Sequence, residues 1–252
     1  DRSQIESFVV GQQIRYILNC AAYTAVDKAE EEREMAFTIN AAGVENIALV
    51  AKQYGVKVIH LSTDFVFDGA STIPYDEESE PHPLSVYGET KLKGEQLLQA
   101  AGGEWLILRT SWLYSEYGSN FVKTMLRLMR ERELLTVVDD QRGSPTYATD
   151  LAEMMIHILQ QSEANGWTNG LFHFSNRGQT SWYGFADAIR RVAGIENCKL
   201  VPVTTAEYPT AARRPAYSVM DLTKISDRFR VEIPTWEEAL QRCIQKILQT
   251  ES

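Results

Sequence analysis

The segments VKVIHL (residues 56–61), VYGETKLKGEQLLQAA (residues 86–101) and WLILRT (residues 105–110) follow one another along the chain. The two short segments are apolar and strand-like, whereas the longer segment between them has a helical pattern. Strands that alternate with helices in this way indicate βαβ units, in which the strands pair in parallel. This stretch therefore predicts an α/β protein with a parallel sheet.

The same alternation continues on both sides of this stretch. A strand-like segment at 15–19 follows a short helix-like piece, and a helical pattern with an acidic first turn follows at 29–54. Later helices are expected at 120–132, at 149–161 with Thr149 as N-cap, at 181–193 and at 235–248. Later strands are expected at 135–138, 171–174 and 199–203. The region from about residue 139 onward is expected to form most of a second lobe.

Composition and charge exclude several classes of protein. Hydrophobic residues make up 44% and charged residues 23%, as in an ordinary globular chain. The net charge of -9 repels phosphate, so we expect no nucleic-acid and no membrane partner. There is no apolar run of about 18 residues and no signal-peptide pattern, so neither a membrane span nor a signal peptide is expected. Cys20, Cys198 and Cys243 lack disulfide or zinc spacing, which favours a reducing cytoplasm.

A phenol and an ammonium stand four residues apart in Tyr87-Gly88-Glu89-Thr90-Lys91, and hence on one face of the predicted helix. A free tyrosine titrates at about pH 10, so it needs a nearby cation before its phenolate is favoured at lower pH. Lys91 could supply that charge. Thr63 comes directly after a predicted strand, where ligands bind in open α/β sheets. Its hydroxyl could bond the same oxygen that Tyr87 protonates, with Ser62 as the alternative.

Four further segments give the pattern its specificity: NCAAYTAVD (19–27), LSTDFVFDG (61–69), YGETKLKGE (87–95) and RTSWLY (109–114). In order and spacing they resemble the dTDP-4-dehydrorhamnose reductase family of extended short-chain dehydrogenases. Residues 120–122, 140–146 and 214–218 are similar to the substrate-lobe motifs of that family. The resemblance therefore runs over nearly the whole chain.

The resemblance implies a Rossmann-like doubly wound parallel sheet with a smaller α/β substrate-binding lobe. Residues 1–138 would form the remainder of the NAD(P)-binding domain with the catalytic residues, and 139–252 mainly the substrate-binding lobe, interleaved with the sheet. It implies reduction of the 4-keto group of dTDP-6-deoxy-L-lyxo-4-hexulose to dTDP-L-rhamnose, for polysaccharide biosynthesis, with NADPH or NADH. The resemblance also implies an association with magnesium and a homodimer. No cluster in the sequence indicates a metal site.

The resemblance also implies roles for the catalytic residues. Tyr87 would donate the proton, Lys91 would hold the nicotinamide ribose and lower the pKa of the tyrosine, and Thr63 would orient the keto oxygen. The other cofactor-binding candidates are Ala21, Ala22, Thr24, Asn40 and Ser62. The other substrate-binding candidates are Trp112, Asn120, Gln141 and Arg214.

Several of these candidates have a plainer structural alternative. Ala21, Ala22 and Thr24 would let the backbone approach a dinucleotide, or would only form a tight turn. Asn40 lies near the active site in the family, or is an amide bonded locally within its helix. Trp112 would wall the sugar pocket, or belongs to the core. Arg214 carries a guanidinium fork that suits a diphosphate, or is a solvated surface arginine.

The sequence departs from the family at its beginning. The family starts with a strand and a glycine-rich turn that receives the cofactor pyrophosphate. None of the 15 glycines here lies in such a motif, and the first family motif begins at Asn19. We expect roughly 40 further residues to precede Asp1 in the complete polypeptide, because a βαβ unit takes 30 or more. The choice between NADH and NADPH would be made in that part. A smaller departure is Phe65, where the family motif usually has tyrosine.

Two other functions stay open at this point. One is another sugar-nucleotide enzyme of the same superfamily, such as an epimerase or a dehydratase. A dehydratase usually has an acidic pair beside the tyrosine, whereas Thr63 is followed by Asp64 alone. The other is a non-catalytic regulatory subunit that resembles the beta subunit of methionine adenosyltransferase.

Overall fold

Four parallel strands form the main sheet of the computed structural model, which describes residues 1–251. In sheet order these are β1 (Tyr16–Asn19), β2 (Lys57–Thr63), β3 (Trp105–Thr110) and β8 (Gly170–His173). Asn19 is paired with His60, and Thr63 with Thr110, so the carboxyl ends of the first three strands meet at one edge. The predicted α/β fold with a parallel sheet is confirmed.

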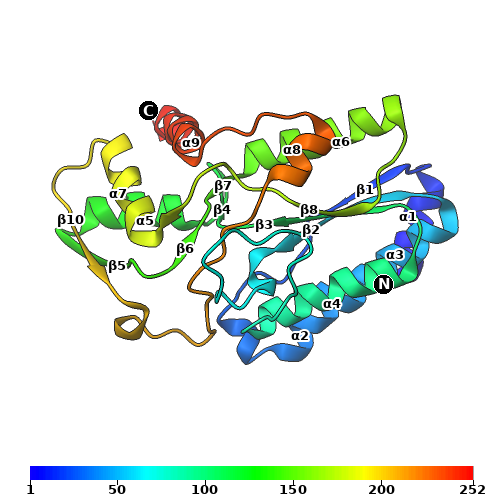
Figure 1. Ribbon diagram of the computed structural model, residues 1–252, viewed down its shortest axis with the longest axis horizontal. Coiled ribbons are helices and arrows are strands. Elements are labelled where there is room, and N and C mark those ends of the chain that lie inside the picture. Colours follow the sequence, from blue (N-terminus) through cyan, green and yellow to red (C-terminus); the bar gives the residue numbers. More distant parts are fainter. Residues whose placement is uncertain (252) are drawn as a thin grey trace.

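Helices cover both faces of this sheet (Figure 1). On one face lie α1 (Arg2–Gly11), α3 (Gly43–Tyr54) and α4 (Val86–Ala101), and on the other lie α6 (Ala148–Asn165) and α8 (Thr223–Phe229). In β3, Ile107 packs with the α3 and α4 side, while Leu106 and Leu108 pack with the α6 side. Because successive side chains of a strand point to opposite faces, a strand buried on both faces reads as a continuous apolar run.

The helix predicted over residues 29–54 begins later, at Arg33, and contains a π-helical segment. The segment between β1 and β2 contains a 3-10 turn η1 (Lys28–Glu30), α2 (Arg33–Phe37), a π-helical segment η2 (Thr38–Ala42) and α3. Of the acidic residues expected in the first turns, Glu34 lies in the first turn of α2. Glu30 ends the 3-10 turn, and its carboxylate accepts a bond of 2.9 Å from the backbone N–H of Val86 in α4.

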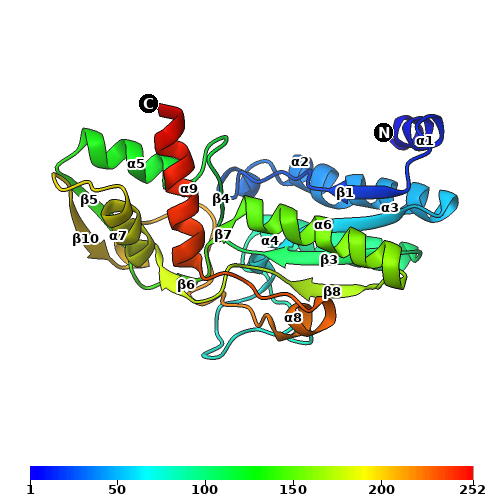
Figure 2. The same cartoon turned by 90° about the horizontal axis from the view of Figure 1, so that it is seen from above.

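A second lobe lies beyond the carboxyl end of β3 (Figure 1). Its two-stranded sheet pairs β5 (Leu134–Val138) in parallel with β10 (Lys199–Val203). Around it pack α5 (Phe121–Glu131), α7 (Trp182–Val192) and α9 (Trp236–Glu251). Figure 2 shows α9 beside these helices, at the end of the molecule away from α1.

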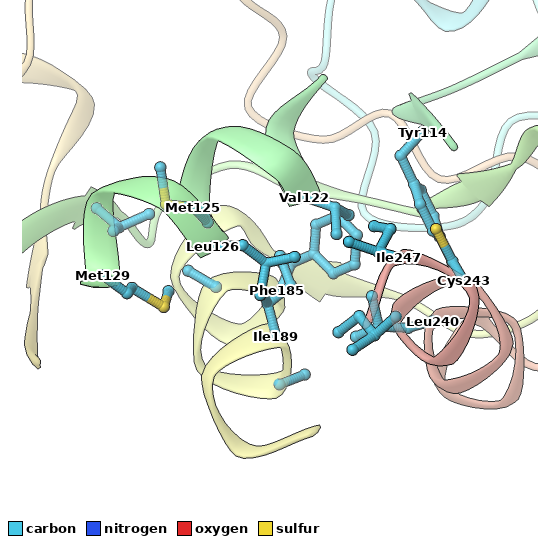
Figure 3. Close-up of a cluster of buried hydrophobic side chains, with 14 of the residues drawn as sticks. Tyr114, Val122, Met125, Leu126, Met129, Phe185, Ile189, Leu240, Cys243 and Ile247 are labelled. Carbon is cyan, nitrogen blue, oxygen red and sulfur yellow. The ribbon is translucent and has the colours of Figure 1, made fainter. Parts of the chain in front are cut away.

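The core of this lobe is made by side chains that the three helices direct toward one another (Figure 3). Phe185 and Leu240 are fully buried there, and Val122 closes the cluster from α5. The helix α5 and the strand β5 pack in this lobe although they precede residue 139. The division of the chain at 138/139 stays a prediction.

Short elements connect the two lobes. They are η3 (Asp64–Val66), β4 (Leu113–Tyr114), β6 (Arg142–Gly143), β7 (Thr146–Tyr147), β9 (Thr180–Ser181) and η4 (Thr205–Glu207). The strand β4 pairs with β7, and β6 pairs with β9. The pairing of β6 with β9 joins a segment that precedes α6 to one that follows it.

The predicted N-cap of α6 is wrong. The helix begins at Ala148, and its N-cap is Tyr147, whose side chain makes no capping bond. The backbone N–H of Tyr147 instead donates to Oδ1 of Asn176 over 2.7 Å, which fixes the start of the helix from a distant loop. Thr149 therefore lies inside the first turn. None of the helices in residues 1–251 is long and apolar enough to cross a membrane.

Candidate active site

The hydroxyls of Thr63 and Tyr87 lie together where β2 ends and α4 begins. Thr63 caps the turn η3, because its Oγ1 accepts from the backbone N–H of Phe65 over 3.2 Å. The same hydroxyl donates to Oδ1 of Asp64 over 3.1 Å and lies close enough to the phenol of Tyr87 to lower its pKa. Ser85 holds the first turn of α4 by accepting from the N–H of Gly88 over 3.2 Å.

Gly88 makes this approach possible. A Cβ at this position would lie 2.2 Å from the carbonyl oxygen of Phe65, so no other residue lets α4 come as close to the end of β2. The rings of Phe65 and Tyr87 then meet edge to face, with 5.5 Å between their centroids. Gly88 therefore allows Tyr87 to lie against Phe65 at the end of β2.

Lys91 lies one helical turn after Tyr87 and is 2% exposed. Its Nζ donates to the carbonyl oxygen of Leu61 over 2.7 Å. Burial lowers the pKa of Lys91 to about 8, and the charges of Glu95 and Cys20 oppose this shift. A buried ammonium with one protein acceptor keeps two further N–H donors for a ligand.

Burial raises the pKa of Tyr87 to about 12, while the nearby hydroxyl of Thr63 lowers it and the charge of Asp64 raises it further. The expected lowering of this pKa by Lys91 is not seen, because burial dominates and the ammonium is directed to Leu61. Tyr87 is therefore protonated at neutral pH, which is the form that donates a proton.

A buried polar network lies beneath these residues. The hydroxyl of Ser62 donates to Glu95, and Glu95 accepts from Arg109 twice, over 3.0 Å from Nε and 2.7 Å from Nη2. All three side chains are buried, so α4 is tied to β2 and β3 directly below Lys91. Ser62, expected to bind cofactor, has its hydroxyl committed to this network.

Asn40 holds the loop that follows β1. Its Oδ1 accepts from the N–H of Tyr23 over 2.8 Å, and its Nδ2 donates to the carbonyl of Tyr23 over 3.1 Å and to Thr90 over 2.9 Å. The fully buried amide is thus not bonded locally, and it lies in the π-helical segment that interrupts the predicted helix. The expected cofactor contacts in the loop, Ala21 and Thr24, are exposed, and Ala22 is half-buried.

Trp112 and Gln141 come together on a third residue, Trp182. The indoles of Trp112 and Trp182 stack with 3.6 Å between their centroids, and Oε1 of Gln141 accepts from Nε1 of Trp182 over 3.2 Å. Trp112 has a φ of 47°, which is strained for a bulky residue. Nothing in the sequence pattern marked Trp182. Asn120 is placed differently, since its side chain caps α5 by accepting from Lys123.

Arg214 is not a solvated surface arginine. Its Nη2 and Nη1 donate to the two carboxylate oxygens of Asp27, over 2.7 Å and 3.1 Å. Asp27 was not among the residues predicted for the site, although it closes the family motif at residues 19–27. Its charge next to a motif of small residues was the available signal.

The family model described as "RmlD substrate binding domain" matches residues 1–249. A dTDP-4-dehydrorhamnose reductase of Escherichia coli strain K12 is 45% identical over 239 residues, covering 93% of this chain and 80% of that protein. One from Sinorhizobium fredii is 44% identical over 252 residues, covering 98% of this chain and 85% of that protein.

The chain belongs to the dTDP-4-dehydrorhamnose reductase family. The crystal structure of a dTDP-4-dehydrorhamnose reductase from Bacillus anthracis, in complex with NADP, superposes with a TM-score of 0.93 at 41% identity. It covers 98% of this chain, and this chain covers 85% of it. A UDP-glucose 4-epimerase from Thermotoga maritima, at 20% identity and a TM-score of 0.83, shows the shared fold alone. The expected Rossmann-like fold and family are confirmed.

No metal centre is evident among residues 1–251. Within residues 1–251 no group of three or more His, Cys, Asp or Glu side chains could hold a metal ion. Asp64, beside the site, is buried and close to Ser218, and burial raises its pKa to about 6.

Proposed function

We propose that this protein reduces the 4-keto group of dTDP-4-dehydro-L-rhamnose to give dTDP-L-rhamnose, using NADPH or NADH. The observation that carries the proposal is the convergence of Thr63, protonated Tyr87 and buried Lys91 at the carboxyl edge of the sheet. This is the edge at which open α/β sheets bind their ligands. Family membership supports the substrate and the cofactor class.

The proton is moved by this chain's own groups. When bound, a nicotinamide supplies the hydride that reduces C4 of the sugar. Tyr87 gives its phenolic proton to the keto oxygen, and a C–O–H group results. Thr63 bonds the same oxygen, and its hydroxyl, which lies close to Tyr87 and lowers its pKa, favours the phenolate that remains. The two N–H donors of Lys91 without a protein acceptor suit ribose hydroxyls.

The remaining candidate residues have proposed roles in binding the cofactor or the substrate. The loop with Ala21, Ala22 and Thr24 would receive the cofactor, and Asn40 would support it by holding Tyr23. Trp112 and Gln141, joined through Trp182, would line the sugar site, and Arg214 would bind the diphosphate. We also propose a cytoplasmic enzyme without nucleic-acid or membrane partners. A homodimer and a role for magnesium rest on the family resemblance alone.

The assay is direct. The full-length protein, mixed with dTDP-4-dehydro-L-rhamnose and NADPH or NADH, is expected to consume reduced nicotinamide and form dTDP-L-rhamnose in equal amounts. The omission of either substrate provides the control. Absence of turnover, together with stable binding to another enzyme, would replace this proposal with the regulatory-subunit reading.

The rate should depend on the charge of Lys91. Because its pKa is lowered to about 8, Lys91 is charged below that pH and becomes neutral above it. We therefore expect kcat/KM to fall as the pH rises through about 8, and Lys91→Ala to lower the rate and the cofactor affinity at pH 7. The matched control is Lys93→Ala, on the exposed side of the same helix. Normal cofactor affinity in Lys91→Ala would contradict the ribose contact.

A further inference from the structure

One carboxylate joins the loop after β1 to the irregular segment that carries Arg214. Asp27 accepts from Nη2 and Nη1 of Arg214 over 2.7 Å and 3.1 Å, and from the backbone N–H of Ala212 over 3.0 Å. The two residues are 187 positions apart in the chain. Asp27 therefore holds both the guanidinium and the backbone that precedes it.

The guanidinium of Arg214 keeps the capacity to bind a ligand. It has five N–H donors, and the bonds to Asp27 and to the carbonyl of Ala212 use three of them. Its side chain is 24% exposed. Arg214 also holds the pKa of the Asp27 carboxyl below its usual value, so the pair is charged at neutral pH. Two donors of an oriented, charged fork remain for an anion.

The backbone on the other side of Arg214 is fixed as well. Gly69, with a φ of +78°, lies so close that a Cβ there would be 2.5 Å from the N atom of Ala216. Backbone bonds of 2.8 Å link Arg142 to Ala216 and Ser218 to Arg142. The backbone that follows Arg214 therefore packs against the loop that follows Thr63. The guanidinium of Arg214 is held by its ion pair with Asp27.

We propose that Asp27 is a positioning residue for the substrate, which holds Arg214 in the orientation that binds the diphosphate of the sugar nucleotide. This inference rests on the proposed function. A long arginine side chain loses rotamer freedom when it binds, and an acceptor that fixes it beforehand reduces that loss. The carboxylate also weakens the positive field of Arg214, so the net effect of its removal distinguishes positioning from competition.

Asp27→Asn removes the charge while keeping the size of the side chain. With the full-length protein we expect KM for the dTDP-sugar and the dissociation constant of dTDP to rise about tenfold, with kcat changed by less than about twofold. Glu131→Gln is the matched control, because it removes an exposed carboxylate that pairs with Arg127 on α5, and both constants should stay unchanged. Circular dichroism and the melting temperature establish that each variant is folded.

The Arg214→Ala background shows whether Asp27 acts through Arg214. There, Asp27→Asn should cause no further loss of dTDP affinity. An additive loss, unchanged constants in the single variant, or tighter binding would each overturn the positioning role. If the unaltered protein binds dTDP but turns over no keto sugar, the proposed function fails, whereas the dTDP measurements still decide the role of Asp27.

Discussion

Tyr87→Phe is expected to lower kcat by about 10²–10⁴-fold, the usual contribution of a positioned general acid. The substitution removes only the hydroxyl, so the ring keeps its edge-to-face contact with Phe65 and the helix keeps its start. The proton must then come from water or from Thr63, which is not arranged to deliver it. Steady-state rates with the dTDP-keto sugar, at saturating NADPH, provide the measurement.

The same variant should bind NADPH with nearly unchanged affinity, because Lys91 and the loop after β1 are left intact. Cofactor binding measured by fluorescence titration separates the chemical step from a general loss of the site. An unaltered kcat in Tyr87→Phe would remove the tyrosine from its role as proton donor.

Glu95→Ala is expected to reduce the free energy of unfolding by about 3–5 kcal/mol, as when one partner of a buried ion pair is removed. Both side chains of the Glu95–Arg109 pair are 3% exposed. Within residues 1–251, Nη1 of Arg109 already lacks a hydrogen-bond partner, and the guanidinium lies 5.2 Å from the ring centroid of Phe67. Truncation would leave a buried cation without its counter-charge.

Urea unfolding of the two proteins gives this difference, provided that the dependence on denaturant is unchanged. The exposed pair of Arg127 and Glu131 is the control, and Glu131→Ala should cost less than about 1 kcal/mol. The double variant Glu95→Leu with Arg109→Met should recover most of the loss, since apolar residues of similar volume replace buried pairs well. A loss below about 1 kcal/mol for Glu95→Ala would contradict the buried-pair interpretation.

Local patterns in the sequence were sufficient for many elements. The helix at 86–101 and the strands at 105–110 and 199–203 have the predicted bounds, because apolar periodicity and flanking glycines act over a few residues. The helix predicted over 29–54 begins only at Arg33 and includes a π-helical segment in its middle. There the tertiary bonds of Asn40 to Tyr23 and Thr90 accompany a π-helical segment that no local propensity indicates.

The candidate site shows the same division. The placement of Tyr87 and Lys91 on one helical face follows from their spacing alone. Their charge states do not, since the raised pKa of Tyr87 and the lowered pKa of Lys91 both arise mainly from burial. Ser62 could not be told apart from a cofactor contact by sequence, because its partner Glu95 lies 33 residues away.

The sequence by itself determined the α/β class, the order of most helices and strands, the family and the pair Tyr87 and Lys91. These depend on short-range periodicity and on motifs with a fixed spacing. Only the tertiary structure decided that Arg214 is held by Asp27, that Trp112 stacks on Trp182, and that α5 and β5 pack in the second lobe. Those contacts join segments far apart in the chain, so they depend on how the two lobes pack rather than on any local pattern.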